Sequence, residues 1–397
     1  MKIYKPEIIE NEENVKIQCY FEYLEGSDYL WYSLDKKYSK YLVTEKLDGF
    51  LLGLLILAMK KREDIYLDWP VSEKLYFNLT NYYIKILSTT AEELQPVKII
   101  PSAFDKGDTY TCEKAVGTGF SGGVDSFCTI YERLFKEDIP ESFKITHFVF
   151  NNVGSHGDFN MDRAQELFNE RYEMLKSFPE GIGKDFIKID SNLSDILKIK
   201  FEPTHTPRNL SVILLLQKLF NKFYYASAYC YTDCCIKFDS GCSASDPITL
   251  SLLSTETLDF IPEGSQYTRV EKTEIISDFE LAQRYLNVCV NEGENCSVCF
   301  KCMRTILTLE ILGKMEQFKK VFNFDKYYWA KCGYITSILK DSQNALGNEI
   351  LELAKSKNFT LPLKSRLTAL LPGSFISKYR KLQNLIRKYK NLKFKKV

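Results

Sequence analysis

Residues 121–126 read Ser-Gly-Gly-Val-Asp-Ser, between a stretch typical of a strand and a stretch typical of a helix. Two adjacent glycines at such a junction let backbone N–H groups converge on an anion, and the helix start adds partial positive charge. Ser121 and Ser126 offer hydroxyl donors, and Asp125 could cap the helix or help to hold Mg²⁺. The chain lacks Gly-x-x-x-x-Gly-Lys-Ser/Thr, so no loop lysine binds the outer phosphates. The loop therefore suits a reaction in which pyrophosphate leaves and the α-phosphate is attacked.

A second group of reactive residues is Cys296-Ser-Val-Cys299-Phe-Lys-Cys302, with Cys289 upstream. Four thiolates on one short segment match the needs of a tetrahedral structural Zn²⁺. An iron–sulfur cluster and scattered buried thiols remain alternatives. Most of the other cysteines lie among apolar residues and are expected in the core. Three of them lie near the predicted site and could be catalytic: Cys234, Cys235 and Cys242.

The loop resembles the PP-loop of the ATP pyrophosphatase superfamily, whose members split ATP into AMP and pyrophosphate. Together with the cysteine run, the chain resembles 7-cyano-7-deazaguanine synthases over residues 113–310. Pro207-Arg208-Asn209 is similar to that family's Arg-Asn motif, and Glu271-Lys272-Thr273 to its lysine-containing segment. The chain departs from the family in several features: the first spacing of the cysteine run is shorter, and the match of the loop at 151–157 is poor. The N-terminal unit and the C-terminal helical extension have no counterpart in the short members of that family.

The resemblance implies an enzyme that adenylates a carboxylate or amide oxygen and lets ammonia or an amine displace AMP. It implies ATP, Mg²⁺ and Zn²⁺ as cofactors. The catalytic residues implied are Asp125, Lys272 and Arg208. The implied nucleotide-binding residues are Ser121, Gly122, Gly123, Val124, Asp125, Ser126 and Asn209, and the implied zinc ligands are Cys289, Cys296, Cys299 and Cys302. His156 and His205 are candidates for proton transfer by location alone, and Asp246 is either a turn residue or a substrate contact.

Other functions remain open at this point. The acceptor is a small molecule or a macromolecule that carries a carboxylate or amide. A divergent synthase-like enzyme could modify a protein, peptide or nucleic acid in an antiphage defence or natural-product operon. A PP-loop sulfurtransferase or amidotransferase would use the same ATP chemistry. A non-catalytic module that binds nucleotide or nucleic acid is the alternative outside enzymes.

The elements that must position these residues fall into three expected regions. Residues 1–112 predict a small α/β accessory domain. Residues 113–310 alternate strand and helix, which predicts an α/β parallel sheet with crossover helices. The resemblance implies that this sheet is Rossmann-like (adenine nucleotide alpha hydrolase) with helices on both faces. In this region strands are expected at 115–120, 145–151, 186–189 and 223–230, and helices at 125–136, 161–177 and 209–221. Residues 311–397 predict a helical extension.

Composition narrows the class of protein. The 397 residues are 45% hydrophobic and 26% charged with a net charge of +1, as in an ordinary globular chain. No signal peptide or membrane-spanning run is evident, which predicts a cytoplasmic protein. Residues 378–397 carry nine Lys or Arg and no acidic residue. This tail could bind nucleic acid, anionic lipid or an acidic protein, or dock as a terminal helix. A homodimer is a further expectation.

Overall fold

The computed structural model describes residues 1–157, 161–238, 240–289 and 293–371. The chain forms two compact units. The first comprises Met1–Val288 with Glu292–Glu294, and the second comprises Cys289–Asn291 with Asn295–Val397. The basic segment 378–397 lies outside the described residues, so its predicted partners stay predictions.

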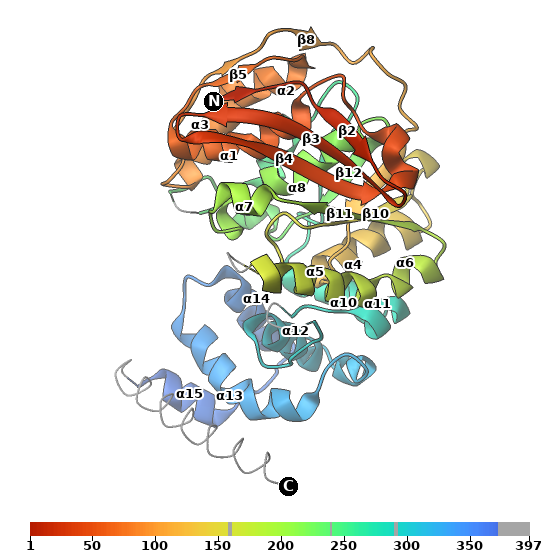
Figure 1. Ribbon diagram of the computed structural model, residues 1–397. Helices are drawn as coiled ribbons and strands as arrows, with labels where there is room; N and C mark the ends of the chain where they lie inside the picture. The colour runs from red at the N-terminus through yellow and green to blue at the C-terminus, as the bar shows by residue number, and fades with distance from the viewer. Residues whose placement is uncertain (158–160, 239, 290–292, 372–397) are drawn as a thin grey trace. The chain divides into compact units, whose positions relative to one another are not determined.

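The first unit is built on one 11-stranded sheet (Figure 1) in the order β13-β12-β9-β10-β11-β4-β3-β1-β5-β7, with β2 paired to β3. Their bounds are β1 Lys2–Ile3, β2 Glu7–Glu10, β3 Asn14–Tyr23, β4 Gly26–Asp35, β5 Ile65–Leu67, β7 Ile99–Ile100, β9 Ala115–Gly119, β10 His147–Asn151, β11 Asp185–Ser191, β12 Phe220–Ala226 and β13 Asp259–Glu263. A separate two-stranded pair joins β6 (Val71–Ser72) to β8 (Phe104–Asp105).

Strands β13, β12, β9, β10 and β11 pair in parallel with one another. Numbered by their order in the chain, these strands run 5-4-1-2-3 across the sheet. This is the doubly wound arrangement, whose strand order reverses between β9 and β12. The expected α/β class with a large, mostly parallel sheet is confirmed, and the arrangement is compatible with a Rossmann-like fold.

Successive residues of a strand point to opposite faces of the sheet, and helices cover the apolar side chains on both faces. In β10, Val149 joins the core formed with α1 and α8, whereas Phe148 packs with Phe120 and Phe178. The helices are α1 Asp48–Lys61, α2 Glu73–Asn78, α3 Ile84–Thr90, α4 Val124–Ile130, α5 Met161–Leu175, α6 Ser177–Gly181, α7 Leu193–Leu197, α8 His205–Ile213, α9 Asp246–Thr249, α10 Arg269–Ser277 and α11 Glu280–Tyr285. A π-helical segment, Tyr131–Phe135, extends α4.

The region 1–112 shares its sheet with the region that follows. Strand β4 pairs antiparallel with β11, with Leu34 opposite Ile189. The side chain of Asn192 accepts from the backbone N–H of Trp31 and donates to the carbonyl of Tyr29. The structure therefore differs from the expected accessory domain, because the boundary at residue 112 falls inside one compact unit. The physical reason is that the outer edge of β11 would otherwise be unpaired.

Element bounds expected from the sequence differ most around α8. The helix expected at 209–221 begins earlier, at His205, and Phe220 already opens β12. Leu214–Leu216, an apolar run, forms a short 3-10 turn between them. Periodicity alone does not separate a buried helix from a buried strand in such a run, so the sequence did not show where α8 ends and β12 begins.

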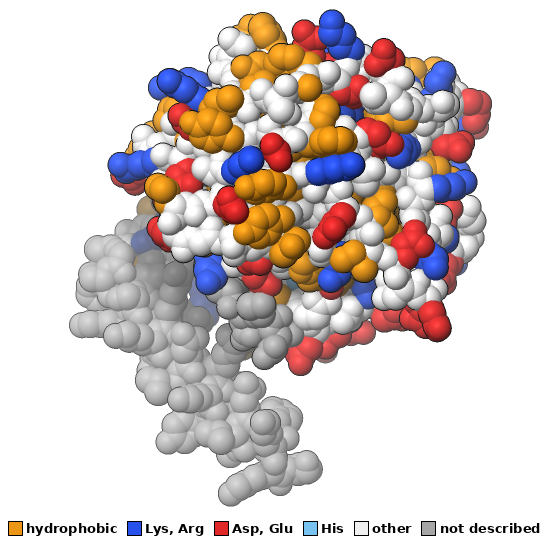
Figure 2. Space-filling view, turned by 45° about the horizontal axis from the view of Figure 1, so that its top comes forward, with side chains coloured by type: hydrophobic (Ala, Val, Ile, Leu, Met, Phe, Trp, Pro, Cys, Tyr) orange, Lys and Arg blue, Asp and Glu red, His pale blue; other side chains and the backbone are white. Residues whose placement is uncertain are grey.

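The second unit contains α12 Phe300–Ile311, α13 Phe324–Lys340, α14 Ala345–Ser356 and α15 Leu363–Ala369. Its helical character agrees with the expectation, although the unit begins before residue 311 and includes the cysteine run. Among the described residues, no helix is long and apolar enough to cross a membrane. On the face of the molecule in Figure 2, charged side chains of both signs lie interspersed with hydrophobic ones.

Candidate functional site

The loop between β9 and α4 lies at the carboxyl end of β9, beside the point where the strand order reverses. Gly122 has a φ of +74°, and a Cβ there would lie 2.7 Å from Cδ2 of Leu175. The carbonyl of Gly122 accepts from the backbone N–H of Asn287 at 2.7 Å. The position therefore requires glycine both for its backbone conformation and for space.

Gly117, Gly119 and Gly122 also have Gly-x-Gly-x-x-Gly spacing. The first two lie inside β9, and only Gly122 lies in the turn. A Cβ on Gly117 would lie 2.8 Å from the rings of Phe220 and Phe223, so this glycine serves packing between strands. The spacing match by itself is therefore weak evidence for a dinucleotide site.

In the described part of the chain, no side chain caps the start of α4 at Gly123. The hydroxyl of Ser121 accepts from the N–H of Gly123 at 3.4 Å, and that of Ser126 donates to the carbonyl of Gly123 at 3.0 Å. Asp125 does not act as the cap either, because Gly123 takes that position. The first turn of α4 therefore keeps N–H groups that an anion could accept from.

Asp125 lies between two cationic side chains of α10. Its Oδ2 is 2.7 Å from Nη2 of Arg269, and its Oδ1 is 3.3 Å from Nζ of Lys272. Lys272 also donates to the carbonyl of Ser227, just after β12, at 2.5 Å, and its side chain is 1% exposed. A capping box of Thr268 and Glu271 fixes the start of α10 and thus both cations. The structure brings together the predicted residues Asp125 and Lys272, which lie far apart in the sequence.

Arg269 is a site residue that sequence reasoning missed. It lies three positions before Lys272, which puts both side chains on one face of α10, and this spacing was the available signal. Its Nε is buried without a hydrogen-bond partner among the described residues, as are the hydroxyls of Ser227 and Ser265 after β12 and β13. Buried donors normally have partners, so these three groups point to a polar ligand at this edge of the sheet.

Arg208 has contacts different from those expected. Its guanidinium is fully buried and donates to Oγ1 of Thr204 at 2.9 Å and to the carbonyls of Ile199 at 2.8 Å and Val153 at 3.3 Å. These contacts tie the segment after β10 to the start of α8. They assign Arg208 a structural role and give no support to the predicted contact with phosphate or substrate.

Asn209 and His205 meet at the hydroxyl of Tyr225. Nδ2 of Asn209 lies 3.3 Å from that hydroxyl and 2.9 Å from the carbonyl of His205. Nδ1 of His205 lies 2.7 Å from the same hydroxyl. These polar groups lie beside the end of β12, and Ser227, the residue just after that strand, carries the Lys272 contact. Asn209 therefore positions neighbouring side chains in this structure.

His156 is a buried core residue. Burial and the nearby Arg171 lower the pKa of His156 to about 3, and its Nε2 lies 3.1 Å from the carbonyl of Asn151. The ring packs with those of Phe150 and Phe168. A neutral imidazole in this setting has little capacity to take up a proton near pH 7, which counts against the role expected for it.

Asp246 opens α9 and is fully buried, in a cluster with Thr206 and Cys242. Oγ1 of Thr206 donates to Oδ1 of Asp246 at 2.7 Å. Burial, with a smaller contribution from Cys242, raises the pKa of Asp246 to about 7. The carboxyl group can therefore exchange a proton near neutral pH.

This raised pKa predicts a dependence of stability on pH. The folded chain holds the Asp246 proton up to about pH 7, whereas the unfolded chain loses it near pH 4, so folding stability falls as pH rises through that window. Between pH 5 and pH 8 we expect the free energy of unfolding of the wild type to fall by about 2–3 kcal/mol relative to that of Asp246→Asn, measured by urea unfolding. Parallel pH profiles for the two proteins would contradict this.

In the second unit, the sulfur atoms of Cys289, Cys296, Cys299 and Cys302 all lie within 4.8 Å of one another, and all four residues are buried. Sγ of Cys299 accepts from the N–H of Cys302 and so caps α12. A hydrogen bond with Cys299 and burial raise the pKa of the Cys302 thiol. A divalent cation would stabilise the thiolates instead, so the donor set fits a metal such as zinc.

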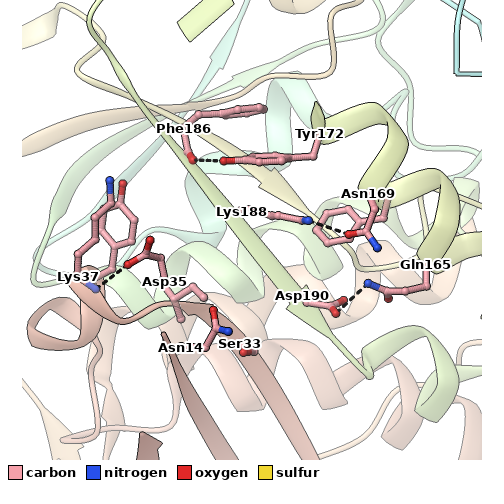
Figure 3. A pocket seen from close by; sticks show the side chains of 13 residues that line it. Asn14, Ser33, Asp35, Lys37, Gln165, Asn169, Tyr172, Phe186, Lys188 and Asp190 are labelled. Atoms are coloured by element: carbon pink, nitrogen blue, oxygen red, sulfur yellow. Dashed lines mark hydrogen bonds between the residues drawn. The ribbon is translucent and has the colours of Figure 1, made fainter. Parts of the chain in front are cut away.

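A hollow of about 370 Å³ lies between α5, β11 and β4 (Figure 3). One face of α5 and one face of β11 line it. Helix α5 contributes residues 165, 168, 169 and 172, and strand β11 contributes residues 186, 188 and 190, which follow the helical and strand periods. Nζ of Lys188 donates to Oδ1 of Asn169 at 2.7 Å, and Gln165 donates to Asp190 at 3.2 Å. Burial lowers the pKa of Lys188. The mixture of amides, carboxylates and aromatic rings could hold a small polar ligand.

Comparison with known proteins gives no relative for this chain: no family model, no curated protein and no solved structure matches it significantly.

Proposed function

We propose that this chain is an ATP-dependent ligase that forms AMP and pyrophosphate. It would transfer AMP to a carboxylate or amide oxygen of an acceptor, after which ammonia or an amine would displace the AMP. The observation that carries the proposal is the convergence of Asp125, Lys272 and Arg269 beside the glycine loop. This cluster lies next to the reversal in strand order, and open α/β sheets bind ligands at such points.

In the first step, the acceptor oxygen bonds to the α-phosphorus, and the bond from that phosphorus to the bridging oxygen breaks. The electron pair leaves with pyrophosphate. The N–H groups of the loop and of the first turn of α4, around residues 121–126, would hold the pyrophosphate. Lys272 and Arg269 would stabilise its growing negative charge, and Asp125 would help to hold Mg²⁺ on the phosphates.

In the second step, nitrogen bonds to the activated carbon and the carbon–oxygen bond to AMP breaks, with one proton released. The state of the cysteines supports nitrogen over sulfur as the nucleophile. Burial raises the pKa of Cys128, in α4, to about 12, and burial also raises the pKa of Cys242 and of Cys234. Thiols of this kind hold little thiolate at neutral pH, which counts against these three cysteines as sulfur nucleophiles.

Acceptors of several kinds are compatible with the same first step. A carboxylated deazapurine, the substrate type of the family that the motifs resemble, is the first to test. A protein, peptide or nucleic acid acceptor would use the same adenylation chemistry. The zinc proposed for the cysteine cluster has a structural role in this reaction, since four thiolates leave no open coordination position.

The experiment that tests the proposal is release of AMP and pyrophosphate by the Asp125→Ala protein. We expect a loss of at least about a hundredfold relative to the wild type, because the phosphates lose their metal-binding carboxylate. The assay uses ATP, Mg²⁺, ammonium and a panel of carboxylates that begins with 7-carboxy-7-deazaguanine. Asp138→Ala, at an exposed aspartate outside the cluster, is the matched control and should keep full activity. Wild-type turnover by folded Asp125→Ala would refute the assignment.

A further inference from the structure

Both carboxylate oxygens of Asp125 are engaged by cations. Oδ2 meets the guanidinium of Arg269 at 2.7 Å, and Oδ1 meets the ammonium of Lys272 at 3.3 Å. A divalent metal that approached this carboxylate would meet two positive charges and find both oxygens occupied. In this arrangement Asp125 is a poor metal ligand, although the proposed function requires it to help hold Mg²⁺.

The two cations differ in how firmly they are held. The side chain of Lys272 is 1% exposed and is also bonded to the carbonyl of Ser227 at 2.5 Å. Arg269 is 12% exposed and opens α10. Beyond its ion pair, its Nη2 reaches the carbonyl of Ala228 at only 3.4 Å, and its Nε is buried with no hydrogen-bond partner in the part of the chain that the structure describes. Arg269 is therefore the group that can move at lower cost.

We infer that Arg269 masks Asp125 until a polyphosphate arrives and draws the guanidinium onto itself. This inference rests on the proposed function and adds an order of binding to it. A guanidinium matches the oxygens of a phosphate in geometry, and the phosphates carry more negative charge than one carboxylate. Once Arg269 turns to the phosphates, Oδ2 of Asp125 is free for the metal. The metal site is thus completed by the nucleotide, and the empty enzyme does not hold the metal.

The test measures metal binding without nucleotide, with Mn²⁺ as the probe and electron paramagnetic resonance as the readout, on zinc-loaded protein. We expect Arg269→Gln to bind Mn²⁺ at least tenfold more tightly than the wild type, because Asp125 loses one of its two cations. The double variant Arg269→Gln/Asp125→Asn should lose this gain, which shows that Asp125 is the ligand. Arg284→Gln, at an arginine paired with Glu280 on α11, is the matched control and should bind like the wild type.

A second arm measures ATP binding by calorimetry on the zinc-loaded protein in buffer without added Mg²⁺ or Mn²⁺. We expect wild-type protein to bind ATP without metal and Arg269→Gln to bind it at least tenfold more weakly, with Arg269→Lys between them. General misfolding would weaken the binding of both ligands, so tighter binding of Mn²⁺ together with weaker binding of ATP excludes it. Mn²⁺ affinity unchanged by Arg269→Gln would overturn the masking role. If the wild type binds ATP neither with Mg²⁺ nor without it, the proposed function itself is refuted.

Discussion

Replacing Lys272 by methionine is expected to lower AMP and pyrophosphate formation by at least about a thousandfold, or about 4 kcal/mol of transition-state stabilisation. Negative charge grows on the leaving pyrophosphate, and Lys272 is the most deeply buried cation of the cluster. A charge in a site closed to water acts more strongly than one in solvent. Methionine has a similar length and no charge, so the variant removes the electrostatic contribution with little change of packing.

Two controls make this result specific. Lys106→Met removes an exposed lysine and should leave activity unchanged. The circular dichroism spectrum of Lys272→Met should match that of the wild type, which shows that the variant is folded at the assay temperature after losing the contacts of Lys272 with Asp125 and Ser227. A folded Lys272→Met protein with wild-type AMP formation would show that the cluster does not act on phosphates.

Removal of the metal from the cysteine cluster is the second change with a large expected effect. Purified protein should contain about one Zn²⁺ per chain, and loss of a structural zinc costs on the order of 10–16 kcal/mol of local folding free energy. The cluster anchors the start of α12, since Cys299 caps that helix. We therefore expect Cys296→Ser to lose the metal and to melt at a much lower temperature.

Cys332→Ser is the matched variant, because Cys332 lies in α13 outside the cluster. It should keep both the metal and the melting temperature. Metal content by mass spectrometry and thermal melts by circular dichroism supply the measurements. Visible absorption from iron in the purified protein would show that the cysteines hold an iron–sulfur cluster and not zinc. A protein without metal that melts at the same temperature as the wild type would refute the assignment of a metal site to the cysteine cluster.

The sequence by itself determined the features that depend on short spacing. The strand–glycine–helix junction at residues 121–126 follows from neighbouring residues, because Gly122 must adopt a positive φ in a tight turn. The four-cysteine cluster is likewise close in the chain, and the structure confirms that its sulfur atoms converge. Strand–helix alternation beyond residue 113 predicted the parallel half of the sheet, which the strand pairing confirms.

Only the tertiary structure decided which distant residues meet. Arg269 joins Asp125 because α10 packs against α4, and nothing near Asp125 in the chain signals that contact. Arg208 lies in a motif expected to bind substrate, yet backbone carbonyls surround its guanidinium. Residues 1–112 extend the sheet because β4 pairs with β11. Local spacing sets backbone conformation and short-range ligand sets, whereas charge pairing and strand edges depend on packing between elements far apart in the chain.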